Sequence, residues 1–227
     1  MKRNDWIVIL VIVLIGVAFA WMPGLALTYE KLNLEHGILM SFVKFAVLAT
    51  FGECLALRIK TGNYNRKGFG ILPRAVVWGF LGITIKMAFV IYASGTPQLL
   101  SYFGWSEVTT SLSGRLSVMA LFTAFSISTA MNLTYAPVMM TIHKITDTHI
   151  LETGGTLRGL LRPIAIGRIF ANLDWKTQWN FVFKKTIPFF WIPAHTITFL
   201  LPVDFQVLFA ASLGIALGLI LSLATQK

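Results

Sequence analysis

Three ionisable side chains fall inside long apolar stretches of the sequence: Lys44, Glu53 and Lys86. Such a group costs roughly 2.5–3.5 kcal/mol at mid-membrane, so it normally faces the interior of a helix bundle or water. The two lysines have a second interpretation, because both lie near the expected outer interface and their long stems can carry the ammonium to the headgroups. The shorter Glu53 favours a buried role. Glu53 and Lys86 are therefore candidate residues of a polar path.

A second group of polar residues lies in the stretch FFWIPAHTITFLLPVDF, residues 189–205. On a helix, Trp191, His195 and Thr198 fall at i, i+4 and i+7 and share one face. Pro193 removes a backbone hydrogen bond, and a broken backbone at membrane depth is tolerated only where it is buried or lines a cavity. The pattern predicts a short, proline-broken helix whose polar face points inward. His195 would sense pH, because its ordinary pKa of about 6.5 is near neutrality.

The fourth apolar run is unusually rich in hydroxyl and amide groups. These groups belong to Ser126, Ser128, Thr129, Asn132, Thr134 and Tyr135. Such side chains either bond neighbouring helices together or line a wet channel, and both interpretations stay open. We include Asn132 among the candidate residues of the path.

His143, Asp147 and His149 suggest a metal site, since positions 143 and 147 share a helical face. A solvated interfacial loop is favoured instead, because no fourth ligand lies nearby. The sequence also lacks the short motifs of serine hydrolases, phosphate-binding loops and zinc proteases. We therefore expect no metal, no cofactor and no enzymatic activity.

The composition places these residues in a membrane protein. The chain has 227 residues, of which 56% are hydrophobic and 12% charged, against about 45–50% and 25% in soluble domains. Each of five apolar runs is long enough to cross a bilayer. They cover residues 6–22, 38–57, 75–93, 116–140 and 205–223. A shorter run with two prolines, 186–201, crosses or bends and re-enters.

We therefore predict an all-α, polytopic bundle of about six spans. It forms one transmembrane domain over residues 1–227, and its fifth span is short and proline-broken. Residues 95–114 would form an outer loop, because they combine Gly, Pro and Ser breakers with Trp105.

The net charge of +10 follows from orientation. Basic residues concentrate in the loops that alternate spans place on one side, which predicts cytoplasmic N- and C-termini. No nucleic-acid partner is expected. The basic, amphipathic segment 143–185 would lie along the inner leaflet, with Arg158, Arg162 and Arg168 contacting anionic lipid. Such a protein would reside in the inner membrane of a prokaryotic cell or in a eukaryotic organelle membrane.

The first 22 residues have two interpretations. Lys2 and Arg3, a short apolar core and the Ala18-Phe19-Ala20 step are typical of a secretory signal peptide. The apolar run continues through Trp21 and Met22, which favours a retained N-terminal helix or signal anchor.

Small residues recur every four positions in the last run, at Ala210, Gly214, Gly218 and Ser222. This pattern predicts a helix face bare enough for close backbone packing. The partner helix belongs either to the same chain or to a second copy. A homo-oligomer through Gly214 and Gly218 is thus one alternative.

Residues 36–227 resemble the Mpv-seventeen and peroxisomal-membrane-protein-twenty-two family of small helical membrane proteins. The resemblance is carried by Trp191-Ile192-Pro193, His195, Thr198, Phe199, Pro202, residues 205–210 and Leu221-Ser222. Further upstream it is carried by Gly52-Glu53, Arg74, Leu81-Gly82 and Asn132 with Ala136-Pro137. The chain departs from the family at Gln206, where the family has Arg, and at Leu217, where it has Trp.

The resemblance implies a non-enzymatic pore or permeability protein for small solutes or ions. The residues that would line or gate the path are Glu53, Asn132, Trp191, His195, Thr198 and Lys86, with Glu53 selecting charge. A structural or lipid-organising scaffold is the alternative from another class. An enzyme that uses His195 with Glu53 or Asp204 is disfavoured, because the predicted depths of these residues differ by more than hydrogen-bond reach.

Overall fold

The computed structural model describes residues 2–113 and 116–224, with side chains through residue 220. All the secondary structure of the described residues is helical. The chain groups into two compact units, Met1–Met40 and Ser41–Lys227.

The first unit contains two helices, α1 (Arg3–Trp21) and α2 (Pro23–Glu35). Pro23 stands at the first position of α2, where its missing N–H costs nothing. Within the unit, the ring of Phe19 packs edge-on against Tyr29 with centroids 5.7 Å apart. No residue of α1 is buried, although the helix is apolar all round. That surface suits hydrocarbon rather than water. The predicted N-terminal helix over residues 1–22 corresponds to α1.

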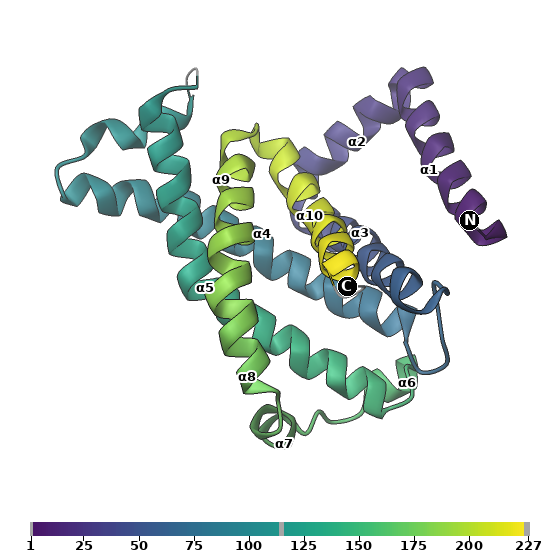
Figure 1. The fold of residues 1–227 in the computed structure, drawn as a ribbon. Coiled ribbons are helices and arrows are strands. Elements are labelled where there is room, and N and C mark those ends of the chain that lie inside the picture. The colour runs from purple at the N-terminus through teal and green to yellow at the C-terminus, as the bar shows by residue number, and fades with distance from the viewer. Residues whose placement is uncertain (1, 114–115, 225–227) are drawn as a thin grey trace. The chain divides into compact units, whose positions relative to one another are not determined.

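Four long helices organise the second unit: α3 (Gly37–Thr61), α4 (Ile71–Tyr102), α5 (Val118–Glu152) and α10 (Val203–Ala224). Together with α1 they are the five helices of the described chain that are long and apolar enough to cross a membrane. Each corresponds to one of the five predicted apolar runs, although Met22 lies beyond α1 and residues 116–117 precede α5. Figure 1 shows α5 changing direction midway along its length, and Pro137 lies inside this helix.

The expected outer loop over residues 95–114 is mostly helical. Pro97 lies within α4, which continues to Tyr102. Two short 3₁₀ helices follow, η1 (Ser106–Thr109) and η2 (Ser111–Ser113). Trp105 stacks on Phe122 of α5 with ring centroids 4.8 Å apart. This contact ties the connection to the bundle. The segment predicted as a loop is thus mostly helical, and its outer location stays a prediction.

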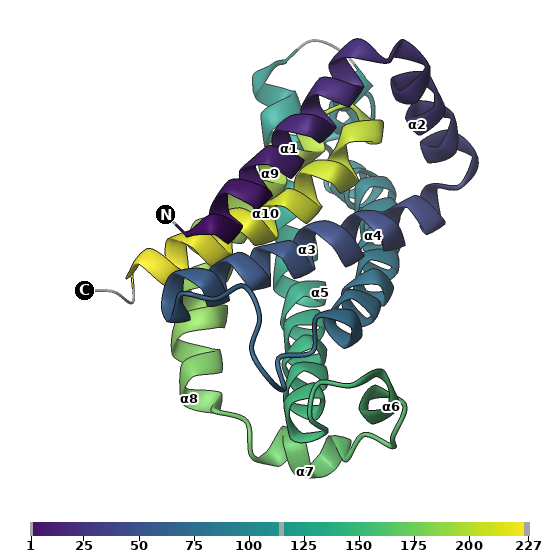
Figure 2. The same ribbon diagram turned by 90° about the vertical axis from the view of Figure 1, so that its right-hand side faces the viewer.

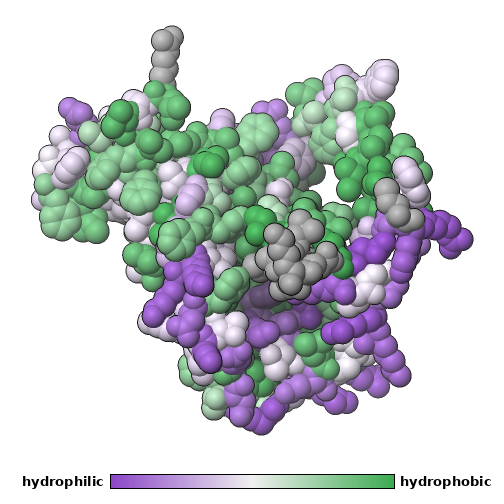
Figure 3. Space-filling model, viewed as in Figure 1, coloured by the Kyte–Doolittle hydropathy of each residue, from purple (hydrophilic) through white to green (hydrophobic). Residues whose placement is uncertain are grey.

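The segment over residues 143–185, expected to be basic and amphipathic, is divided among several helices. Its first part belongs to α5, and α6 (Leu157–Leu160) and α7 (Ile166–Ala171) are short. Gly154 and Gly155 have positive φ and end α5, and a Cβ on Gly155 would lie 2.6 Å from the Gly68 carbonyl oxygen. Only glycine fits this approach of two chain segments. In Figure 3 hydrophilic residues gather at the end of the second unit that carries these short helices.

The proline-containing run is a longer and more continuous helix than predicted. α8 (Trp175–Thr177), η3 (Gln178–Trp191) and α9 (Ile192–Leu200) follow one another end to end, with 3, 14 and 9 residues. η3 is a π-helix, and right-handed dihedrals at both junctions keep the axis unbroken. Pro188 lies within its wide turns, while Pro193 lies in the first turn of α9, where no donor is needed. The prolines therefore widen the helix rather than break it.

The small-residue face of α10 packs on α3 of the same chain, beside which it runs (Figure 1 and Figure 2). A Cβ on Gly52 would lie 3.0 Å from the backbone of Gly214, and one on Gly218 would lie 3.1 Å from the Gly52 carbonyl oxygen. Ala210 belongs to the main hydrophobic core. The partner helix for Ala210, Gly214 and Gly218 therefore belongs to the same chain, which is one of the two alternatives left open by the sequence. The side chain of Ser222 lies outside the described residues.

Candidate functional site

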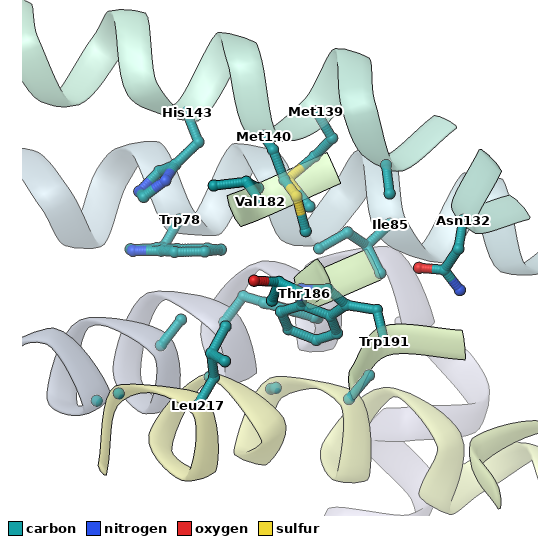
Figure 4. Close-up of a pocket in the computed structure, with 18 of the residues that line it drawn as sticks. Trp78, Ile85, Asn132, Met139, Met140, His143, Val182, Thr186, Trp191 and Leu217 are labelled. Carbon is teal, nitrogen blue, oxygen red and sulfur yellow. The ribbon is translucent and has the colours of Figure 1, made fainter. Parts of the chain in front are cut away.

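A cavity of about 350 Å³ lies inside the second unit, enclosed by α3, α4, α5, η3, α9 and α10 (Figure 4). Its walls are mostly apolar and include Phe45, Ile85, Met131, Met139, Met140 and Leu217. One wall is formed where α3 packs closely on α10. Only small residues line it: Ala49, Gly52, Gly214 and Gly218. Two polar centres line this cavity, one ionic and one neutral.

The ionic centre joins three helices. The Arg74 guanidinium of α4 pairs with both Glu53 of α3 and Asp147 of α5. Arg74 is only 6% exposed, and its Nε donates to the Phe69 carbonyl oxygen at 2.8 Å. Its guanidinium also lies over the Phe69 ring, 4.4 Å from the centroid. The single Arg74 cation thus forms ion pairs with two carboxylates, a hydrogen bond to a carbonyl and a cation–π contact with an aromatic ring.

Two aromatic side chains complete the environment of Glu53. Trp78 Nε1 donates to Glu53 Oε1 at 2.7 Å, and His143 Nε2 lies 3.1 Å from the same oxygen. The rings of Trp78 and His143 have centroids 4.3 Å apart. Figure 4 shows them one above the other on the same side of the cavity. The carboxylate therefore lines the cavity with its charge already balanced by its neighbours.

The neutral centre connects α5 to α9. Ser128 Oγ donates to the Ile192 carbonyl oxygen at 2.7 Å, and Asn132 Nδ2 donates to the Ser128 carbonyl oxygen at 2.8 Å. His195 Nδ1 lies 3.0 Å from Asn132 Nδ2 and 3.2 Å from Asn132 Oδ1. Trp191 stacks on His195 with centroids 5.2 Å apart, and its buried Nε1 has no hydrogen-bond partner in the described part of the chain. This indole N–H is an unused donor at the cavity wall.

A second cavity adjoins the first through the contact of Phe89 with His195. Phe89 packs edge-on against His195 with centroids 5.8 Å apart and against Phe199 at 5.0 Å. Phe89 and Phe199 also line the second cavity, of about 360 Å³, together with Lys86 and Gln206. The two cavities are therefore neighbours, because Phe89 of the second contacts His195 of the first.

The predicted path residues divide among three locations. Glu53, Asn132, Trp191 and His195 line the first cavity, and Lys86 lines the second. Thr198 is fully buried, donates to the Ala194 carbonyl oxygen at 2.9 Å and lines neither cavity.

Sequence reasoning missed four members of the ionic centre. Arg74 was named only as part of the family resemblance, Trp78 was not singled out, and His143 and Asp147 were assigned to a solvated loop. That assignment is wrong, because both residues lie on α5. The helical spacing of His143 and Asp147 was the usable signal, since it places both on one face. The described residues contain no group of three or more His, Cys, Asp or Glu side chains placed to hold a metal ion.

Most polar groups of α5 bond to neighbouring helices or to their own backbone. Tyr135 and Thr84 hydroxyls lie 2.8 Å apart, and those of Tyr92 and Thr134 lie 2.6 Å apart, which joins α4 to α5. The interhelical bonding predicted for this run is therefore present, together with Asn132 at the cavity wall.

The basic residues predicted to contact lipid differ in their surroundings. Arg168 makes a two-fold contact with Glu152, at 3.0 Å and 2.5 Å. The pKa of Arg168 is raised, mainly by these hydrogen bonds and to a smaller extent by the negative charge of Glu152. Arg158 and Arg162 are exposed. Lipid contact through these three arginines stays a prediction.

Comparison of the chain with protein-family models, curated proteins and solved structures finds no match.

Proposed function

We propose that the protein is an integral membrane pore or permeability protein for small solutes or ions. The observation that carries this proposal is the pair of neighbouring cavities, which meet where Phe89 of the second contacts His195 of the first. Hydrophobic constrictions are a common way to gate a path through a membrane protein. In the proposed pore, Phe89 and Phe199, which pack on each other, form the constriction between the two cavities.

In the proposed arrangement, the chain makes about six spans, with α8, η3 and α9 as the fifth. The termini are cytoplasmic, because the hydrophilic end with the short helices α6 to α8 carries many of the basic residues. The ionic centre then lies near the inner surface, the neutral centre near mid-depth and Lys86 near the outer surface. The resemblance to the Mpv-seventeen family supports the same kind of function.

The size of the first cavity favours small solutes. Ligand sites of about 300–1,000 Å³ hold molecules up to the size of a drug, and this cavity has about 350 Å³. Its mostly apolar wall suits a solute with an apolar body and few polar groups.

The test is solute flux in liposomes that contain the purified protein. Phe89→Ala and Phe199→Ala should each increase the flux several-fold, because either change removes half of the constriction. Phe125→Ala is the matched control, since Phe125 is 50% exposed on α5 and lines neither cavity. If the wild type and all variants are folded and inserted but pass no solute, the proposal is wrong.

A structural scaffold is the second candidate, favoured by the hydrogen bonds that the α5 side chains make to other helices. Asn132→Leu discriminates the two functions. In a pore this change alters solute selectivity as well as stability, because Asn132 lines the cavity. In a scaffold it lowers stability alone.

A further inference from the structure

We infer that the solute is a small organic anion, a carboxylate with an apolar body, and that Lys86 is the residue that selects its charge. This inference rests on the proposed function and names its substrate class. It follows from the polar groups along the two cavities that the described chain leaves without partners.

Each carboxylate near the path already has a cationic partner, because Arg74 pairs with both of them. Glu53 lines the first cavity, but Arg74, Trp78 and His143 all contact its carboxylate. Asp147 pairs with the same guanidinium and does not line the cavity. A cationic solute would have to displace one of these partners, and a buried ion pair that loses one member is strongly destabilised. Glu53 was expected to select charge, but its carboxylate is already engaged. We therefore assign that role to Lys86.

Three donors along the two cavities have no partner in the described chain. Lys86 is half-buried in the second cavity, and no described residue bonds to it or forms an ion pair with it. Lys144 lines the first cavity beside His143 and is likewise without an ion pair in the described chain. Between them, the buried Trp191 Nε1 has no acceptor. Figure 4 shows its indole between Thr186 and Leu217.

This order of donors describes a route for a monovalent anion. An unpaired lysine within a span normally has an anionic or polar partner, and positively charged side chains select anions in pores. One ammonium at each end and one neutral N–H between them match a single negative charge. The apolar walls favour a carboxylate with a hydrocarbon body over inorganic phosphate, because they offer no groups to replace the hydration of a multiply charged ion.

The test compares four probes: butyrate, butanol, butylammonium and inorganic phosphate. The first three share the same apolar body and differ in charge. Wild-type protein in liposomes should pass butyrate fastest. Lys86→Met should lower butyrate flux about tenfold, the scale of one lost charged contact, and leave butanol flux unchanged. Trp191→Phe, which keeps the ring and removes the N–H, should reduce butyrate flux by a smaller factor.

Lys67→Met is the matched control, because Lys67 is exposed and lines neither cavity. It should leave all four fluxes unchanged. Binding in detergent adds a readout that needs no transport: butyrate should raise the unfolding temperature of the wild type and of Lys67→Met, but not that of Lys86→Met.

The outcomes separate the two proposals. If solutes pass but butylammonium or phosphate matches butyrate, or Lys86→Met leaves the butyrate preference intact, the anion inference is wrong while the pore proposal stands. If no probe passes and butyrate still stabilises the wild type through Lys86, the pore is wrong and the anion site stands. If butyrate neither passes nor binds, the anion inference fails.

Discussion

The two polar centres of the first cavity offset the cost of burying polar groups in different ways. The ionic centre places Glu53, Arg74 and Asp147 where α3, α4 and α5 converge, and each charge is answered by another. The neutral centre joins only α5 and α9, through Ser128, Asn132 and the Ile192 carbonyl. A charge in an apolar bundle must be paired, so it fixes several helices at once, whereas a neutral group holds one neighbour at lower cost.

The largest expected effect comes from removing the central cation. Arg74→Met leaves two carboxylates without their shared partner, and the loss of one member of a buried pair costs about 3–5 kcal/mol. We expect a large decrease in the unfolding midpoint in detergent, measured by circular dichroism. Arg158→Met, at an exposed arginine, controls for the loss of a positive charge. If the two variants are equally stable, the ionic centre does not connect the helices.

A second prediction concerns the cavity wall where Gly52 of α3 packs on Gly214 of α10. Gly52→Ala places a methyl group 3.0 Å from the Gly214 backbone, whereas the equivalent atom in Gly214→Ala would lie 3.7 Å from Ala49, which is ordinary contact. Gly52→Ala should therefore cost about 1–3 kcal/mol by overpacking, and Gly214→Ala much less. Urea or thermal unfolding of both variants in detergent measures the difference. The reverse order would contradict the close packing of α3 on α10 at the ionic end.

The neutral centre should be weaker. Asn132→Leu and His195→Phe each remove one side of the contact between α5 and α9, and hydrogen bonds between membrane helices average about 0.6 kcal/mol. A double-mutant cycle in thermal unfolding should give a coupling energy of this size. A coupling energy as large as that of the ionic centre would contradict the prediction that the neutral centre is the weaker of the two.

The smallest effect is expected at an exposed ionised group outside the spans. Thr177 donates its hydroxyl and its backbone N–H to Asp174, and these bonds hold the pKa of the Asp174 carboxyl below its ordinary value. The stabilisation is present above the unfolded pKa of about 4 and is lost as the pH falls through the lower folded pKa. Asp174→Asn should thus lower the unfolding midpoint slightly at neutral pH and have no effect in acid. An equal decrease at both pH values would show that the charge contributes nothing.

Apolar length and small-residue spacing were sufficient to predict much of the fold. The five long helices follow from continuous apolar runs, and the face of Gly214 and Gly218 follows from four-residue spacing. Glu53, Asn132, Trp191 and His195 were also predicted as lining residues, since a polar side chain in an apolar run has few other places to go.

The remaining features depend on distant contacts or on backbone geometry. Arg74 and Asp147 lie far apart in the sequence and each resembles an ordinary residue at the end of a span, so their ion pair could not be read from either segment. The π-helix was missed because prolines predict a break when an α-helix is assumed. The role of Phe89 was hidden because its apolar side chain resembles any other core residue.

The continuous helix of α8, η3 and α9 has a consequence for how the protein is made. None of its three parts is among the helices long and apolar enough to cross a membrane, and Lys184, Lys185 and His195 within the run disfavour its insertion on its own. Its backbone carbonyl at Ile192 and its His195 are bonded by Ser128 and Asn132 of α5. In the proposed six-span arrangement, α5 would therefore enter the bilayer first, and the later helix would insert against it.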